Sequence, residues 1–254
     1  MLLSLESIKD YQYCPQLFKN NYLLNERPSK SSTIDKFSTY CLFKTFEWFF
    51  NIIQDQKRIP TFTLVKQKFG ELYSKDRTVA ETVFMNSVQF NRGRVLEKRC
   101  VEALRHFYDM FSNNAGVPLL INKEYRLSVD GIEVVGFISV IRETKTKDIE
   151  LMTFYPDHIS GKAPTLEIDA NRDICTIGAS IAFKQMYGSF PDVHKAYAMF
   201  TGREFTCTVN AASHHNFNTI VSKIGKNIEN NMYYPVYNDH CINCAYRNKC
   251  VKGW

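Results

Sequence analysis

The sequence predicts a mixed α/β fold in which a helical N-terminal lobe precedes a sheet-containing core. Three observations predict it. The first half of the chain carries apolar residues three to four positions apart, which is the period of an amphipathic helix. The middle contains Asp130-Gly131 between two apolar-rich runs, a strong hairpin signal. Helical and strand patterns then alternate toward the C-terminus, as in a sheet flanked by helices.

The lobe is predicted to contain three long helices, the second of them directly after Pro60. The third has the clearest amphipathic pattern, because Leu96, Cys100 and Leu104 recur on one face while charged residues occupy the rest. The helices are expected over residues 34–56, 61–74 and 93–111.

The core is predicted to begin with three antiparallel strands, the first two joined by the Asp130-Gly131 turn and the third following a polar turn. A helix, a further strand and a last helix complete it. Strands are expected over residues 119–129, 132–141, 149–155 and near 194–201, and helices over about 171–187 and 213–230.

We expect a single domain over residues 1–254, because the chain shows no repeats, no low-complexity segment and no linker. Its three parts are a helical lobe (1–115), an α/β core (116–205) and a C-terminal helix followed by a cysteine cluster (206–254).

Composition excludes several classes of protein. The eight cysteines in 254 residues are too sparse for a secreted disulfide scaffold, and the N-terminus has no signal-peptide pattern. No uncharged stretch approaches the roughly 20 residues of a membrane span. We therefore expect no membrane contact and a reducing, cytoplasmic compartment. The net charge of +6 is compatible with attraction to nucleic acid but is no evidence of it.

A cysteine cluster is the most informative feature of the chain. Cys241, Cys244 and Cys250 follow the pattern Cys-x2-Cys-x5-Cys, and Cys14 offers a fourth thiol near the opposite end. Thiolates are ligands of zinc and of iron–sulfur clusters, and both commonly need four. A metal held by all four would join the first turns of the chain to its last. The remaining cysteines are expected to be small buried apolar residues: Cys41, Cys100, Cys175 and Cys207.

Both ends of the chain carry motifs of a known family. The segment from Ser7 to Phe18 contains Cys14-Pro15, and Tyr234-Pro235 precedes the three C-terminal cysteines. With the strand–strand–strand–helix order between them, the chain resembles the PD-(D/E)XK nuclease superfamily. The likeness is to its iron–sulfur branch, with the RecB-like exonucleases, the AddB nuclease domain and the CRISPR-associated adaptation nucleases. The resemblance implies a restriction-endonuclease-like core with a mixed sheet.

The same resemblance implies a 4Fe–4S cluster that clasps the two termini. Its ligands would be Cys14, Cys241, Cys244 and Cys250. Chemistry alone leaves zinc as the alternative, because four thiolates suit it equally well.

The family's catalytic positions are changed in this chain. The family carries an aspartate in a Gly-x-x-Asp strand and an Asp/Glu-x-Lys motif on the next strand, which hold Mg or Mn ions and orient water. Here Ser139 follows Gly136 at the aspartate position, while Met152 and Phe154 occupy the acid and lysine positions. Shifting the register by two offers Glu150 as the acid but leaves Met152 at the lysine. We therefore predict a degenerate site without catalytic residues.

Two further motifs of the family are also altered. Glu97 stands where the family has a metal-binding histidine, and the helix after Asp173 lacks the Gln-x3-Tyr motif. No phosphate-binding or dinucleotide-binding glycine motif is present in the sequence. The acidic residues that could rebuild an Mg or Mn site are Glu124, Asp148, Glu150, Asp157, Glu167 and Asp169.

The sequence therefore predicts an iron–sulfur, nuclease-like protein that has lost catalysis. We expect it to bind DNA or a protein partner as a subunit in replication, recombination or packaging, and its short, divergent chain suggests a phage or other mobile-element origin. Two alternatives stay open. One is an active Mg- or Mn-dependent DNA exonuclease with re-sited carboxylates, and the other is a structural component of a larger complex.

Overall fold

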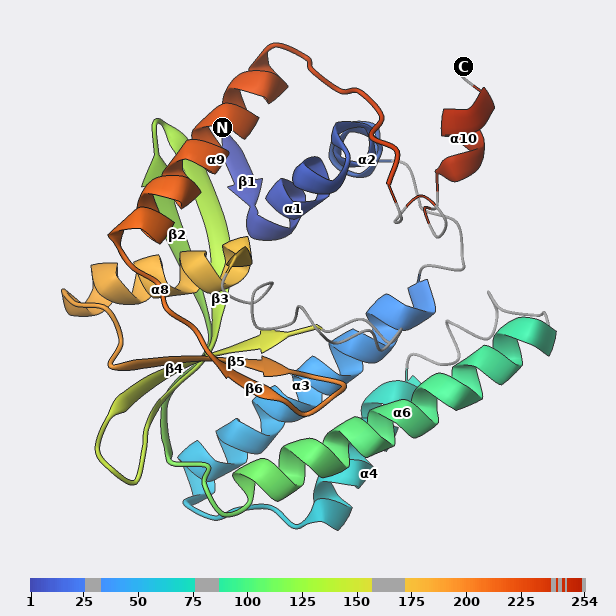
Figure 1. Cartoon of the computed structure of the whole chain (residues 1–254). Helices are drawn as coiled ribbons and strands as arrows, with labels where there is room; N and C mark the ends of the chain where they lie inside the picture. The colour runs from blue at the N-terminus through green and yellow to red at the C-terminus, as the bar shows by residue number, and fades with distance from the viewer. Residues whose placement is uncertain are drawn as a thin grey trace.

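A computed structural model of the chain describes residues 1–25, 33–75, 87–156, 172–238, 241, 244 and 246–252. The predicted mixed α/β class is confirmed, because a mixed six-stranded sheet lies between helices (Figure 1).

The N-terminal segment consists of one short strand and three short helical elements, and it contains Cys14 of the candidate site. Ser4 caps its first helix by accepting a hydrogen bond from the Ser7 amide at 3.0 Å. Pro15 then opens a second short helix, where its missing N–H costs nothing. The elements are β1 (Leu2–Ser4), α1 (Leu5–Tyr13), α2 (Pro15–Phe18) and a π-helical turn, η1 (Lys19–Leu23).

The helical lobe matches the prediction except at one boundary. The third helix begins at Ser87 instead of residue 93, because a single glycine is tolerated inside a helix and Gly93 does not start one. The three helices are α3 (Thr33–Gln56), α4 (Phe62–Lys75) and α6 (Ser87–Phe111).

The sheet is organised around a long central strand, β3. The predicted hairpin is present, and Asp130 and Gly131 both adopt positive φ angles of 48° and 77°, as a tight two-residue turn requires. Strand β2 pairs antiparallel along one edge of β3, while β1 (parallel) and β4 (antiparallel) share the other edge. The strands are β2 (Val117–Val129), β3 (Ile132–Glu143), β4 (Ile149–Tyr155), β5 (Val193–Ala198) and β6 (Glu204–Thr206).

The second half of the sheet is built by a crossover. Helix α8 (Ile174–Tyr187) connects β4 to β5, which pair in parallel, and β6 adds an antiparallel edge. The Asp173 carboxylate accepts the Thr176 amide at 3.0 Å to start α8, and Gly188 ends it with a φ of 81°.

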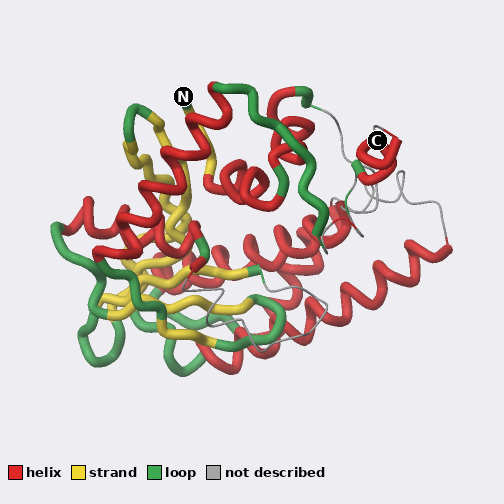
Figure 2. Tube along the Cα trace, turned by 45° about the horizontal axis from the view of Figure 1, so that its top comes forward, coloured by secondary structure: helices red, strands yellow, loops and turns green. Residues whose placement is uncertain are grey.

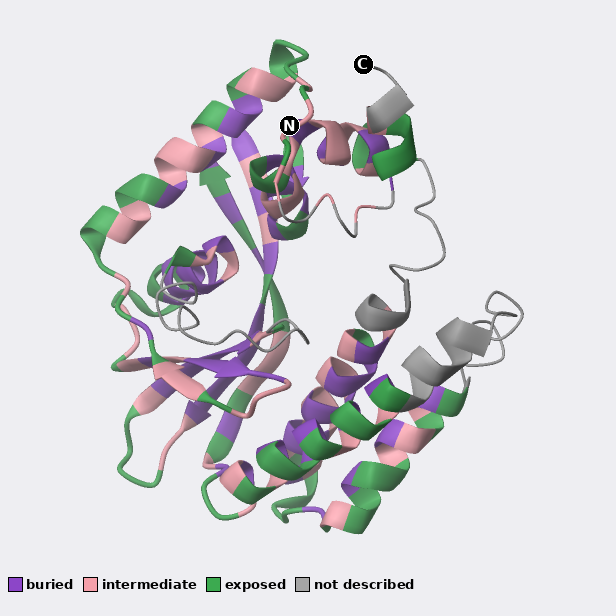
Figure 3. Cartoon of the chain, turned by 45° about the vertical axis from the view of Figure 1, so that its right-hand side comes forward, coloured by how far each residue is buried: buried purple, intermediate pink, exposed green. Residues whose placement is uncertain are grey.

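Helices cover both faces of the sheet, so that two apolar clusters form (Figures 2 and 3). One cluster joins the sheet to α1, α8 and α9 (Ala211–Glu229) through residues such as Ile138 and Phe217. The other joins it to α3, α4 and α6 and is rich in phenylalanine, including Phe46 and Phe107.

The chain returns to its start after α9. Residues 232–238 run beside α1 and α2, and a short helix, α10 (Arg247–Lys252), contains Cys250, the last cysteine of the cluster (Figure 1). In the described part of the chain, no helix has the length and apolarity that a membrane crossing needs.

Candidate metal centre and nuclease-like site

The four predicted cysteines come from the two ends of the chain, which the fold brings together. Cys14 lies between α1 and α2 in an extended conformation, and its sulfur accepts the Val236 amide at 3.4 Å. The Cys241 sulfur accepts the Asn238 amide at 3.4 Å. Sulfurs that accept backbone N–H groups are typical of thiolate ligands, because such hydrogen bonds stabilise negative charge on sulfur.

Hydrogen bonds other than those to sulfur also join the two ends. Two involve tyrosine hydroxyls, one an asparagine amide and one a backbone amide. They are Tyr11 Oη to Met232 O (2.6 Å), Gln16 N to Tyr234 O (3.3 Å), Asn238 Nδ2 to Tyr13 O (3.0 Å) and Tyr246 Oη to Asn21 Oδ1 (2.7 Å).

The four thiols lie within electrostatic reach of one another. Burial raises the pKa of Cys244 and of Cys250, and the nearby sulfurs of Cys14 and Cys241 raise both pKa values further. Among the described residues, however, no group of three or more His, Cys, Asp or Glu side chains reaches a metal-holding arrangement. In the described part of the chain, the four cysteines are therefore not arranged as a formed metal site.

Four thiols are the donor set that zinc and iron–sulfur clusters commonly need. The four cysteines come from two segments, and backbone amides donate to two of the sulfurs, those of Cys14 and Cys241. Because four thiolates in one place repel, a bound cation would favour all four in their charged form. A metal at Cys14, Cys241, Cys244 and Cys250 would cross-link the chain ends and couple metal binding to folding.

The three nuclease-like positions lie in the core. The Ser139 hydroxyl accepts the Phe154 amide at 3.1 Å, so it serves the backbone of β4. Met152 is fully buried, and the Phe154 ring packs edge-on against Phe46 with 5.3 Å between centroids. Ser139 thus links β3 to β4, while Met152 and Phe154 pack between the sheet and the helical lobe.

The surroundings of Phe154 are aromatic. Phe46 and Phe107 stack at 3.8 Å, and Tyr197 meets both rings edge-on. Hard divalent cations require oxygen ligands and keep water around them, and an aromatic cluster supplies neither. The face of the sheet at Met152 and Phe154 is consequently packed as a hydrophobic core.

Gly136 has a packing role that does not depend on catalysis. A Cβ at this position would lie 2.5 Å from the Tyr125 ring and 2.7 Å from the Leu5 side chain. Glycine is therefore needed at position 136 because Tyr125, directly opposite it on β2, approaches closely.

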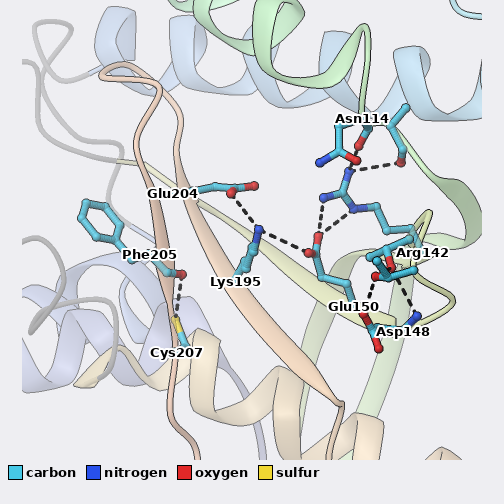
Figure 4. Close-up of polar contacts among 11 residues, drawn as sticks. Asn114, Arg142, Asp148, Glu150, Lys195, Glu204, Phe205 and Cys207 are labelled. Carbon is cyan, nitrogen blue, oxygen red and sulfur yellow. Dashed lines mark hydrogen bonds and ion pairs between the residues drawn. The ribbon is translucent and has the colours of Figure 1, made fainter.

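Glu150 is engaged in a buried ion pair (Figure 4). Arg142, which lies directly opposite it on β3, approaches its Oε1 through Nε at 2.6 Å and Nη2 at 2.5 Å. Lys195 lies 3.5 Å from Oε2 and also pairs with Glu204 at 2.9 Å. Arg142 Nη1 additionally donates to the Asn114 carbonyl at 2.6 Å. The Glu150 carboxylate is thus saturated by cations of the protein.

The other acidic candidates are dispersed. Glu124 is exposed on β2 and pairs with Arg126 at 3.3 Å; it lies opposite Phe137 of β3, whereas Glu150 lies opposite Arg142. Asp148 lies in the β3–β4 turn, where it accepts the Thr146 hydroxyl at 2.5 Å. Glu97 is half-buried on α6. Three candidates lie outside the described residues: Asp157, Glu167 and Asp169.

Sequence reasoning missed a buried histidine in β5. His194 bonds the Thr153 hydroxyl at 3.0 Å through Nε2 and the Ser180 hydroxyl at 2.7 Å through Nδ1, so it links β4, β5 and α8. Burial lowers its pKa from 6.5 to about 3, and the ring is neutral in the folded protein. A single histidine in an apolar strand gave no signal of these contacts.

His194 predicts an acid-dependent loss of stability. The unfolded chain takes up a proton near pH 6.5, whereas the folded chain does so only near pH 3. The free energy of unfolding should therefore be maximal above this window and decrease as the pH falls, by about 2 kcal/mol at about pH 5. Urea unfolding at several pH values measures this loss. A His194→Asn variant should have a shallower pH dependence, and an equal slope in both proteins would contradict the assignment.

Comparison with known proteins adds little to these observations. No family profile matches the sequence, and no curated protein is similar to it. One solved structure, titled "Crystal structure of SSO0001", aligns with 85% of this chain and 96% of its own at 10% identity, with a TM-score of 0.39. A likeness that weak supports no conclusion about this chain.

Proposed function

We propose that the chain is a PD-(D/E)XK nuclease-like protein that has lost catalysis and keeps a 4Fe–4S clasp. It would bind DNA or a protein partner within a DNA-processing complex. The observation that carries the proposal is the burial of the three positions that are catalytic in the family. Ser139, Met152 and Phe154 are packed into the core, and the nearest acid in sequence, Glu150, is neutralised by Arg142.

The order of elements supports the family part of the proposal. Three antiparallel strands (β2, β3 and β4) are followed by α8 and by β5, which is parallel to β4. This is the strand–strand–strand–helix order expected from the resemblance. The cysteines lie outside this core, on segments that close over its end at α1 and α2.

The clasp and the catalytic site have separate physical roles, so one can persist without the other. Four thiolates around a metal stabilise the fold whether or not substrate is cleaved. Carboxylates gathered at a scissile phosphate repel one another and are useful only for catalysis. Replacement of the two acids by the uncharged residues Ser139 and Met152, with all four cysteines kept, is therefore the expected outcome for a nuclease fold used only for binding.

A cleavage and binding assay tests the proposal. Anaerobically purified protein is incubated with labelled single- and double-stranded DNA in the presence of Mg or Mn, with and without EDTA. We expect no degradation and a mobility shift that weakens as salt is raised. A known magnesium-dependent nuclease serves as the positive control.

Two other outcomes would contradict the proposal in different ways. EDTA-sensitive degradation that a Glu124→Gln or Glu150→Gln variant loses would mean an active nuclease with re-sited ligands. Absence of both cleavage and a shift would remove the DNA-binding part and leave a protein-interaction or structural role.

A further inference from the structure

The return segment, residues 232–238, contains both partly buried and exposed side chains. Tyr233 turns inward, where its ring stacks on Phe18 with 6.3 Å between centroids and its hydroxyl donates to the Ile228 carbonyl at 3.0 Å. Met232, Tyr234 and Tyr237 turn outward and are 45%, 51% and 64% exposed. The segment therefore combines a half-buried anchor, Tyr233, with several solvent-facing side chains.

These side chains are held on a fixed backbone. The carbonyls of Met232 and Tyr234 accept hydrogen bonds from α1 and α2, and the Val236 amide donates to the Cys14 sulfur. The Asn238 side chain donates to the Tyr13 backbone carbonyl, and the Tyr13 side chain is 44% exposed. We call Tyr13, Tyr234 and Tyr237 the tyrosine row.

Tyr234 and Tyr237 expose two aromatic rings within four residues of one segment. Tyrosine buries a large ring area when it stacks, while its hydroxyl tolerates water, so exposed tyrosines suit a surface that is only sometimes covered. Because the backbone beneath Tyr234 is already tied to α2, little further ordering would be needed on binding. The row is thus pre-organised for flat ligands.

Positive charge accompanies the row. The last fourteen residues contain Arg247, Lys249 and Lys252 and no acidic residue. Arg247 and Lys249 are exposed on α10, which the Tyr246 hydroxyl ties to Asn21 at the end of the same N-terminal segment. Aromatic rings beside a cationic helix provide the two contacts that a single strand needs, base stacking and phosphate neutralisation.

We propose that the tyrosine row binds single-stranded nucleic acid, with bases stacked on Tyr234 and Tyr237 and phosphates near Arg247 and Lys249. The inference rests on the proposed DNA-binding function and specifies its surface and its strand preference. Duplex DNA suits the row poorly, because its bases are already stacked on one another and cannot reach the rings.

Fluorescence anisotropy with a labelled oligothymidylate of about 20 nucleotides tests the inference. A Tyr234→Ala/Tyr237→Ala variant should bind at least about tenfold more weakly, since each stacked base contributes. A Tyr234→Phe/Tyr237→Phe variant keeps the rings and should stay within about twofold of the unmodified chain. An Arg247→Ala/Lys249→Ala variant should bind more weakly and with a smaller salt dependence.

The matched control is Tyr187→Ala, which removes a 49% exposed tyrosine from α8, away from the clasp (Figure 1). It should leave binding unchanged. Circular dichroism and metal content, measured on every variant, establish that the fold and the clasp are intact.

The outcomes separate this inference from the function on which it rests. If the unmodified chain binds the oligonucleotide and the double alanine variant binds it equally well, the row is not the site, while DNA binding itself stands. If the unmodified chain does not bind at low salt, the DNA-binding proposal fails and the inference fails with it. A dimer that the double alanine variant abolishes would identify the row as a contact between two copies and overturn the inference.

Discussion

Replacing Cys244 by serine is expected to lower the iron content of the purified protein and to destabilise the entire domain. A serine hydroxyl is a poor ligand at neutral pH, so the metal would lose one of four ligands and the link between the chain ends. Since metal binding is coupled to folding, the melting temperature should fall by roughly 10 °C. Iron analysis and thermal unfolding under anaerobic conditions measure both effects on the same sample.

Cys207→Ser is the matched control for this substitution. Cys207 is buried, and its sulfur lies 3.8 Å from the Phe205 carbonyl (Figure 4), a contact that a hydroxyl can reproduce. This variant should keep its iron and lose little stability. If Cys244→Ser kept both iron and melting temperature, the assignment of the four cysteines as ligands would be wrong.

Replacing Arg142 by methionine is expected to lower the free energy of unfolding by about 3–5 kcal/mol. Arg142 is almost fully buried and supplies the two closest cationic contacts of the Glu150 carboxylate. Without it, Glu150 keeps only Lys195 at 3.5 Å, and Lys195 is shared with Glu204. A buried charge that loses its partner is far more costly than the loss of an exposed ion pair. Urea unfolding measures the difference.

Two further variants show whether the effect belongs to the buried pair. Lys147→Met removes the cation of an exposed pair with Glu143 and should change stability by less than about 1 kcal/mol. Arg142→Met/Glu150→Met removes both buried charges and should regain much of the loss. A double variant as unstable as the single one would show that packing of Arg142, and not the charge of Glu150, determines the cost.

Local patterns were sufficient to predict most of the fold. The Asp130-Gly131 turn located β2 and β3, and β4 was predicted over its full range of Ile149–Tyr155. By contrast, β1 and β6 have only three residues each, too few for an alternating pattern, and they depend on pairing with distant strands. The end of β5 was predicted three residues too late, because the chain turns after Ala198 to pair with β6.

The parts of the candidate site that depend on the spacing of residues in the sequence were predictable. The parts that depend on contacts between distant residues were not. The cysteine spacing and the apolar residues at Met152 and Phe154 are visible in the sequence alone. The burial of Glu150 against Arg142 requires the strand register, and the partners of His194 lie on two other elements. Whether an acidic residue is available to a metal is therefore a property of the tertiary structure.

The quantity of iron and acid-labile sulfide in anaerobically purified protein tests the clasp most directly. A 4Fe–4S cluster at Cys14, Cys241, Cys244 and Cys250 predicts about four iron atoms and about four sulfides per chain, with a brown colour and absorbance near roughly 400 nm. A colourless protein with about one zinc per chain would contradict the iron–sulfur assignment, and a stably folded chain without any metal would contradict the clasp itself.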